Sequence, residues 1–395
     1  MFGIFLVLAL FGCGSGDKAE DQAQQPATQQ EKQAEAQKAE PAKAPLRIGA
    51  VLRLSKGASD GIPAKHGIEI AVDMINAKGG INGRNLEILY YDSKDDATTA
   101  VNAVQKLISV DKVPAIIGPM MSGNVLAAAP LCNRDQVVLI TPTGTSPKIS
   151  EAGEFVFRIC SRIDMQAMAL VNKALAMADK PQPTVAIVYS NEPYGKGCLM
   201  LFEKYLAEAN ITPAAVESFQ VGDKDFQSQL TKLVPINPDL LFFPGYLQET
   251  APLLSQARNM GLTGLSVGVF GDMAPLYIEL AGPAAENHII AGEYDQDVQS
   301  PQNLEFVARY ETKLKAEPNA PNNIMFAALT FDSVNILAKA LESGATTGPE
   351  IQKFMAGIID FEGVTGSLGF DENGDVQKGG IALFQVKDGA YHKVH

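Results

Sequence analysis

After residue 45, short runs of β-branched and other apolar residues alternate with segments in which apolar residues recur at helical spacing. The first apolar run, residues 46–52, predicts a strand. The next segment predicts a helix, because its apolar residues fall at i, i+3, i+4 and i+7, namely Ile68, Ala71, Val72 and Ile75. Gly79 and Gly80 follow as the expected end of this helix, since glycine readily adopts the left-handed conformation of a helix C-cap.

The same alternation continues along the chain in two series of similar length. The first series has further strands over residues 86–91, 114–118 and 137–141 and helices around 101–108 and 125–132. The second has strands over residues 184–189, 215–219 and 239–243 and helices over 164–178, 194–210, 226–234 and 250–260. Helices over residues 303–315 and 323–342 and closing strands over 366–371 and 381–386 come last. Strands alternating with helices are typical of parallel sheets covered on both faces, so we predict an α/β fold with two lobes and a cleft between them.

The first twelve residues are almost wholly apolar, yet a membrane-spanning helix needs about 20 such residues. A short apolar run of this kind is typical of a secretory signal peptide, and Leu10-Phe11-Gly12-Cys13 resembles the lipobox of bacterial lipoproteins. We therefore expect residues 1–12 to be a lipoprotein signal peptide and Cys13 to carry the lipid. A plain signal peptide is the alternative, because residues 1–12 lack the usual Lys or Arg; a start codon further upstream would explain their absence.

The segment that follows has a different composition. Residues 14–45 contain no Val, Ile, Leu, Met, Phe, Tyr or Trp, so they cannot bury enough apolar surface to offset the entropy of ordering. We expect residues 13–45 to be a disordered tether behind the lipidated cysteine, with an end-to-end distance on the order of 30 Å. The alternative for part of it is a helix over residues 29–40, which are rich in Ala, Gln, Glu and Lys.

Composition and charge exclude several classes of protein. The chain has 395 residues, of which 46% are hydrophobic, and a net charge of −13, which argues against nucleic acid as a partner. Its four histidines are scattered, and it contains no P-loop, no nucleophile elbow and no zinc-peptidase motif, so we expect no metal, no cofactor and no enzymatic activity. The acidic segment over residues 371–375 predicts a hairpin turn rather than a calcium loop. Apart from Cys13, an odd number of cysteines remains, namely Cys132, Cys160 and Cys198.

Several short motifs, in a fixed order, carry a resemblance to a known family. They are AVDMINAKGGING over residues 71–83 with Tyr91-Asp92-Ser93 beyond it, Ile117-Gly118-Pro119 followed by Ser122, ITPTGT over 140–145, YGKG over 194–197, PGY over 244–246 and AALTFD over 327–332. Together, and with a lipobox in front, they resemble the leucine/isoleucine/valine-binding family of type I periplasmic binding proteins, the substrate-binding components of ABC importers. The resemblance extends from residue 46 to the C-terminus.

This resemblance implies a fold and a function. The fold is periplasmic-binding-protein-like type I, with two doubly wound α/β lobes joined by a three-segment hinge. One lobe would take residues 46–163 plus 291–374, and the other residues 164–290 plus 375–395. The protein would be a monomer, anchored by its lipid on the periplasmic or cell-surface side of a bacterial membrane. It would capture a branched-chain or related amino acid and deliver it to an ABC permease and ATPase.

Two other functions remain open on the sequence. The first is a sensor lipoprotein that binds a small amide or carboxylic acid and signals through a membrane partner. The second is an enzyme that uses a cleft serine such as Ser122 as its nucleophile, although no partner base is evident.

The candidate ligand site lies in loops that follow predicted strands, because ligands of doubly wound sheets bind beyond the carboxyl ends of the strands. Ser122 offers a hydroxyl at a helix N-terminus, and Gly144 and Thr145 offer backbone N–H groups and a second hydroxyl, which together suit a carboxylate. The alternatives are a simple N-cap for Ser122 and a polar turn for residues 141–146. The resemblance implies that these positions hold the α-carboxylate of the ligand.

The resemblance also assigns ligand-binding roles to residues of the second lobe. In the first lobe, it leaves open the role of two charged residues. Asp272 would accept the ligand's ammonium group, although an ungapped register places Phe270 there, and Asp272 could instead cap the helix over 275–281. Tyr194 and Tyr246 would wall the side-chain pocket, unless they only pack at the edge of the lobe. Near the start, Arg53 and Asp60 either form a charge pair suited to a polar ligand or face solvent.

Overall fold

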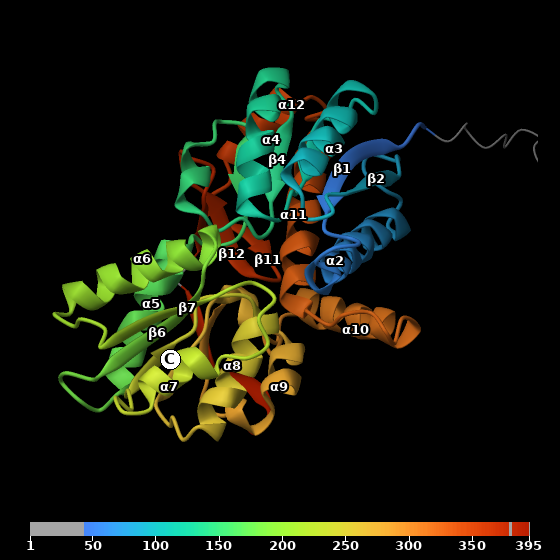
Figure 1. Ribbon diagram of the computed structural model, residues 1–395. Coiled ribbons are helices and arrows are strands. Elements are labelled where there is room, and N and C mark those ends of the chain that lie inside the picture. Colours follow the sequence, from blue (N-terminus) through green and yellow to red (C-terminus); the bar gives the residue numbers. More distant parts are fainter. Residues whose placement is uncertain (1–42, 379–380, 395) are drawn as a thin grey trace, which may run out of the picture. The chain divides into compact units, whose positions relative to one another are not determined.

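The computed structural model describes residues 43–378 and 381–394, and Figure 1 shows their elements in sequence colours. The predicted signal peptide, Cys13 and nearly all of the predicted tether lie outside the described residues. Within the described part, two sheets built mainly of parallel strands are flanked by helices, and a small third sheet is antiparallel. The predicted α/β fold class is therefore confirmed.

The first sheet has the strand order β2-β1-β3-β4-β5, and all its pairs are parallel. Its strands are β1 (Leu46–Leu52), β2 (Leu86–Asp92), β3 (Ala115–Ile117), β4 (Val138–Thr141) and β5 (Val156–Arg158). The inner strands β3 and β4 are buried at every residue, which explains why they read as continuous apolar runs rather than as alternating ones. The carboxyl ends of β1, β3 and β4 are therefore neighbours at one edge of the sheet.

Helices and one short 3-10 segment cover this sheet. They are α2 (Ala58–Ala77), α3 (Ala97–Ser109), α4 (Ser122–Asp135), η1 (Pro147–Glu151), α10 (Pro301–Ala316), α11 (Ile324–Glu342) and α12 (Gly348–Ala356). Among the described residues, α11 is the helix long and apolar enough to cross a membrane, but 83% of its apolar window is buried inside the protein. It packs against α2 (Figure 1) and serves as the central core helix of this lobe.

The second sheet has the order β15-β14-β10-β9-β8-β6-β7. Its strands are β6 (Val185–Ser190), β7 (Ala215–Phe219), β8 (Leu240–Phe242), β9 (Leu265–Val267), β10 (Ile289–Gly292), β14 (Ala382–Lys387) and β15 (Ala390–Val394). Its helical segments are α5 (Ile163–Met177), α6 (Pro193–Glu208), α7 (Gln227–Leu233), α8 (Leu247–Asn259), η2 (Phe270–Asp272), α9 (Pro275–Ala281) and η3 (Gly282–Ala285). Strand β14 pairs antiparallel with β10, and β15 pairs antiparallel with β14, so the C-terminal residues form one edge of this sheet.

The small third sheet consists of β11 (Phe361–Gly363), β12 (Gly366–Phe370) and β13 (Val376–Lys378), paired antiparallel. A turn over residues 371–375 joins β12 to β13, as the sequence predicted for this acidic segment. Asp371 stabilises the turn because its Oδ1 accepts hydrogen bonds from the backbone N–H groups of Asn373 and Asp375, each at 2.9 Å. Gly374 adopts a φ of +73° there, which favours glycine.

The chain passes between the two large lobes three times, after β5, after β10 and after β13. Glu293, directly after β10, links the three passages through its buried carboxylate. It accepts hydrogen bonds from the N–H and hydroxyl of Ser161 in the first passage, and Lys378 at the start of the third lies 3.0 Å from it. Arg158, the last residue of β5, and Asp375, directly before β13, form a second buried ion pair beside the first and third passages. The residue limits given above for the two lobes stay a prediction.

Candidate ligand site

Ser122 is the first residue of α4, directly beyond the carboxyl end of β3. The N-cap is Met121, whose side chain forms no capping hydrogen bond, so the first-turn N–H groups of this 14-residue helix are not capped by a side chain. Ser122 does not act as the N-cap; its hydroxyl oxygen instead accepts a hydrogen bond from the Ser146 N–H at 3.2 Å. This hydrogen bond connects the loop after β3 to the loop after β4.

Three hydroxyl hydrogen bonds shape the loop after β4. Thr141 donates to the Pro119 carbonyl at 2.8 Å and accepts from the Gly144 N–H at 3.1 Å. Thr143 donates to the Met120 carbonyl at 2.8 Å. The loop is therefore a structured turn fixed against the loop after β3, and the structure brings three of the predicted ligand residues together, namely Ser122, Gly144 and Thr145.

Thr145 keeps free hydrogen-bonding groups at this edge. Its carbonyl accepts from the Ile163 N–H at 3.0 Å, but within the described part of the chain neither its N–H nor its hydroxyl has a hydrogen-bond partner. Beside it, the N-terminus of α4 contributes N–H groups and the positive end of a helix dipole. This arrangement can bind a carboxylate without any cationic side chain in direct contact with it.

A buried arginine that the sequence did not single out lies behind this loop. Arg158, the last residue of β5, is 0% exposed, and one of its Nη atoms donates to the carbonyls of Gly144 and Ser146 at 3.3 and 2.7 Å. Its partner is the carboxylate of Asp375. The sequence signal was weak because the two residues lie 217 positions apart.

The two predicted tyrosines lie together in the second lobe. Tyr194 is in the first turn of α6, after β6, and Tyr246 is the N-cap residue of α8, after β8. Their rings are stacked, with centroids 5.3 Å apart and planes at 22°. Burial raises the pKa of both phenols, so both are neutral and offer an apolar face with a hydrogen-bonding tip.

Asp272 lies inside the second lobe and is 0% exposed. Its Oδ1 accepts a hydrogen bond from the Thr250 hydroxyl at 2.8 Å and its Oδ2 from the Val269 N–H at 3.3 Å. Burial raises the pKa of this carboxyl to about 8. It does not cap α9, whose N-cap residue is Ala274. The role of Asp272 as the ammonium partner stays a prediction.

Phe270, the alternative position, faces the other lobe. Its ring packs on Phe326 of α11, with centroids 5.6 Å apart, and it is part of the core cluster around α11. This contact joins the loop after β9 to the first lobe.

The structure resolves the alternatives for Arg53 and Asp60 in favour of a charge pair. Arg53 follows β1, and its guanidinium donates to Asp60 at 2.5 Å and to Asp95 at 2.8 Å. The three side chains are only 13%, 20% and 31% exposed, so they are not simply solvated. Desolvation raises the pKa of Asp60, although the charge of Arg53 opposes this rise. Asp95, from the loop after β2, was not predicted.

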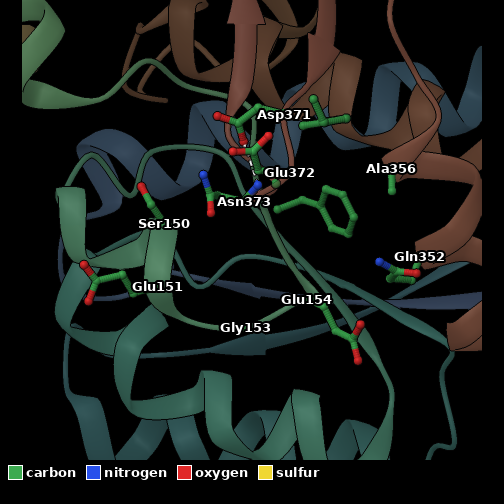
Figure 2. A pocket seen from close by; sticks show the side chains of 12 residues that line it. Ser150, Glu151, Gly153, Glu154, Gln352, Ala356, Asp371, Glu372 and Asn373 are labelled. Carbon is green, nitrogen blue, oxygen red and sulfur yellow. Dashed lines mark hydrogen bonds between the residues drawn. The ribbon is translucent and has the colours of Figure 1, made fainter.

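Two pockets in the described part of the chain have different lining residues. The pocket in Figure 2 has a volume of about 500 Å³ and lies between η1, α12 and the 371–375 turn, and none of the six predicted ligand residues lines it. A second pocket of about 350 Å³ is lined from both lobes, by Ser59 and residues 318–323 on one side and by Leu247 and residues 274–276 on the other. None of the six predicted ligand residues lines this pocket either, although Ser59 and Leu247 are the sequence neighbours of Asp60 and Tyr246.

The described residues form neither a metal site nor a reactive thiol. They contain no group of three or more His, Cys, Asp or Glu side chains that could hold a metal ion. Cys132, Cys160 and Cys198 are free and buried, and burial raises the pKa of each thiol, to about 12 for Cys132 and Cys160. All three are therefore unreactive thiols at neutral pH.

Comparison with known proteins gives a family match over most of the chain. The model of the family described as "Periplasmic binding protein" matches residues 45–390. This chain belongs to that family. The family consists of substrate-binding proteins without enzymatic activity, so the enzyme alternative for Ser122 is not supported.

Individual relatives of this periplasmic binding protein cover nearly the whole folded part. The leucine-, isoleucine-, valine-, threonine- and alanine-binding protein of Pseudomonas aeruginosa is 30% identical over 81% of this chain and 83% of its own length. The Leu/Ile/Val-binding protein of Escherichia coli is 29% identical over 79% and 82%. The structure of LivJ from Streptococcus pneumoniae in complex with isoleucine aligns with a TM-score of 0.78 at 28% identity, covering 89% of this chain and 99% of that one. The predicted type I fold is therefore confirmed.

Proposed function

We propose that this protein captures a branched-chain or related amino acid in the cleft between its lobes and delivers it to an ABC importer. The observation that carries this proposal is the edge formed by the α4 N-terminus and the Thr145 loop, whose N–H and hydroxyl groups suit a carboxylate. It occurs in a chain 30% identical to a leucine-, isoleucine-, valine-, threonine- and alanine-binding protein. The partner would be the permease and ATPase of the importer.

Each part of the ligand has a proposed partner. The carboxylate would bind Ser122 and the N–H groups and hydroxyl of the loop at Gly144 and Thr145. The side chain would lie against the stacked rings of Tyr194 and Tyr246. The ammonium group would lie toward Asp272, whose pKa would fall again beside a positive charge, because an opposite charge favours the ionised carboxylate.

The N-terminal segment supports a location outside the cytoplasm. We propose that residues 1–12 are removed as a signal peptide and that Cys13 carries the lipid anchor. Residues 14–45, which lack large apolar side chains, would serve as the tether. Labelling with a radioactive fatty acid, compared between the wild type and Cys13→Ser, tests the anchor; equal labelling of the two would exclude it.

Titration calorimetry tests the ligand. The full chain carrying Cys13→Ser is titrated with the free amino acids, and at least one neutral aliphatic amino acid is expected to bind with a micromolar or tighter Kd. The same panel includes small amides and carboxylic acids, which the charge pair of Arg53 and Asp60 favours and which a sensor lipoprotein would bind. Binding of an amide or acid alone would support the sensor function, and silence across the panel would overturn both.

The ammonium partner has its own test. At pH 7 the carboxyl of Asp272 carries a proton, because its pKa is about 8. If it meets the ammonium group, ligand binding releases that proton, and the measured binding enthalpy then depends on the ionisation enthalpy of the buffer. Asp272→Asn should remove this dependence and weaken binding at least tenfold. Unchanged affinity in Asp272→Asn would show that Asp272 does not bind the ligand.

A further inference from the structure

Arg158 uses all five N–H donors of its guanidinium inside the protein. One Nη atom donates to the carbonyls of Gly144 and Ser146, and the other donates to the Ser150 hydroxyl at 2.9 Å and to Asp375. Nε donates to Asp375 at 3.0 Å. Because Arg158 is 0% exposed, it cannot itself contact a ligand in the cleft.

The hydrogen bond to Gly144 sets the direction of one peptide group. In a planar trans peptide the C=O and the N–H point to opposite sides of the chain. The Gly144 carbonyl points back to Arg158, so the Thr145 N–H, which belongs to the same peptide, points away from Arg158. This N–H has no partner within the described residues, and it is one of the groups proposed to bind the ligand's carboxylate.

Asp375 connects this arrangement to the hinge. It is the last residue of the 371–375 turn, directly before β13, after which the chain crosses for the third time, and the backbones of Arg158 and Asp375 also form an isolated parallel bridge. A buried guanidinium needs a charged partner, because an unpaired charge in the protein interior is costly. The conformation of the loop over residues 143–146, which Arg158 holds, therefore depends on Asp375, a residue beside the third crossing.

We propose that Arg158, paired with Asp375, is a positioning residue for ligand binding. It holds the Gly144–Thr145 peptide so that its N–H faces the ligand's carboxylate, and it joins that loop to the hinge. This inference rests on the proposed function, since it takes the ligand to be a carboxylate.

Arg158→Lys is the informative variant. Lysine keeps the positive charge beside Asp375, but its single ammonium group cannot span a carboxylate and two carbonyls as the planar guanidinium does. Arg162→Lys is the matched control. Arg162 lies in the same crossing and also 3.7 Å from Asp375, but its hydrogen bonds go to Asp164 and not to the loop.

Two measurements decide the proposal. In ligand-free protein, hydrogen exchange of the amides over residues 143–146 should be at least tenfold faster in Arg158→Lys and unchanged in Arg162→Lys. In titrations, Arg158→Lys should weaken leucine at least tenfold but leucinamide less than threefold, because the amide lacks the anionic group that the Thr145 N–H binds. A merely structural role would weaken both ligands by the same factor.

The outcomes separate this inference from the proposed function. Equal losses for leucine and leucinamide, or loop exchange in Arg158→Lys that matches the wild type, would overturn the positioning role. If the wild type binds neither compound, the proposed ligand class is wrong, and the exchange measurement alone decides whether Arg158 holds the loop. Should Arg158→Lys fail to fold, Asp375→Asn is measured in the same way, with the same direction of change expected at residues 143–146.

Discussion

The carboxyl of Asp272 is buried without a cation beside it. His288 lies 3.9 Å from Oδ2, but burial lowers the pKa of His288 to about 3, so its ring is neutral. Desolvation raises the pKa of Asp272 to about 8. The hydrogen bonds that Asp272 accepts favour the ionised form, but their effect on the pKa is smaller. Over most of the physiological pH range, Asp272 therefore takes up a proton when the protein folds.

This protonation predicts a pH dependence of stability. Between about pH 4 and pH 8 the unfolded chain has lost the proton of Asp272 and the native state still holds it, so the free energy of unfolding falls as pH rises through this window. Above pH 8 this contribution no longer changes. Asp272→Asn should lack this fall. The free energy of unfolding of the wild type relative to the variant should therefore decrease by several kcal/mol in total between pH 4 and pH 8. Urea unfolding at half-unit steps of pH measures this, and parallel profiles for the two proteins would contradict it.

The pair of Arg53 and Asp60 should set the preference for the ligand's side chain. Both lie at the carboxyl end of the first sheet, next to the pocket that both lobes line. Replacing the pair together, as Arg53→Met with Asp60→Leu, removes both charges and leaves without a partner only Asp95, the most exposed of the three side chains at 31%. The ratio of leucine to threonine affinity should then rise about tenfold, which corresponds to the burial of roughly two methylene groups.

Controls for this prediction are the single variants. Arg53→Met leaves both Asp60 and Asp95 unpaired, so it should destabilise the protein more than the double variant does, whereas Asp60→Leu keeps Arg53 paired with Asp95 and should not. Calorimetry gives the affinity ratio and thermal unfolding gives the stability. A ratio that stays constant in the double variant would place the pair outside the ligand pocket.

Among the candidate site residues, the sequence alone could predict the position of those that lie in a loop directly after a predicted strand. Ser122, Gly144 and Thr145 were placed by a local rule, since each lies in a loop beyond the carboxyl end of a strand. Arg158, Asp375 and Glu293 were missed, because their importance comes from partners more than 100 residues away. No local pattern distinguishes a buried, paired arginine from a solvated one.

At the scale of elements, the pairing of α2 with α11 depends on one glycine. A Cβ atom at Gly67 would lie 1.9 Å from the Ala327 carbonyl oxygen, which is backbone and cannot move aside. The close approach also allows the Thr330 hydroxyl of α11 to donate to the Ala64 carbonyl of α2 at 2.7 Å. The two longest helices of the first lobe therefore pack backbone to backbone at this point.

Gly67→Ala should separate these helices and destabilise the protein. The expected loss is roughly 2–4 kcal/mol, similar to other cases of overpacking in a core, and it outweighs the gain in helix propensity. Gly123→Ala in α4 is the control, because a Cβ there meets no atom within 4 Å. Chemical unfolding compares the two variants, and similar stabilities would show that the helices tolerate the methyl group.

Elements with a marked apolar run or helical period were predicted, including the three-residue buried strands β3 and β8, whereas several others were not. The strand over residues 46–52 and the helix over 275–281 have the predicted bounds, and α11 lies within one residue of its prediction at the N-terminal end. Strands β5, β11 and β13, each of three residues, and helix α12 gave no prediction. A three-residue strand is too short to show a period, so the sequence predicts it only where it forms part of a longer apolar run, as β3 and β8 do.

At the scale of the whole molecule, Glu293 holds the three crossings together. Its side chain is 2% exposed and that of Lys378 is 9% exposed, so the pair is shielded from solvent. The amide of Gln166 on α5 also donates to it, at 3.3 Å. The hinge therefore contains a buried polar centre to which each crossing contributes.

Glu293→Gln should weaken this centre strongly. The variant leaves the ammonium of Lys378 buried without a charged partner, a change that costs about 3–5 kcal/mol. Glu342→Gln, which breaks the exposed pair with Lys339, should change stability by less than about 1 kcal/mol. Thermal unfolding of the two variants measures the difference. Equal midpoints would show that solvent reaches the hinge and compensates the lost charge.

The last residues of the chain complete the second sheet. Strand β14 pairs with β10, with Ile289 opposite Gln385, and β15 then covers the edge. In a chain that emerges N-terminus first, neither lobe is complete early in synthesis, because the first lobe lacks its core helix α11 until residue 342 and the second sheet lacks β14 and β15 until residue 394. We therefore expect the two lobes to complete their packing together rather than one after the other.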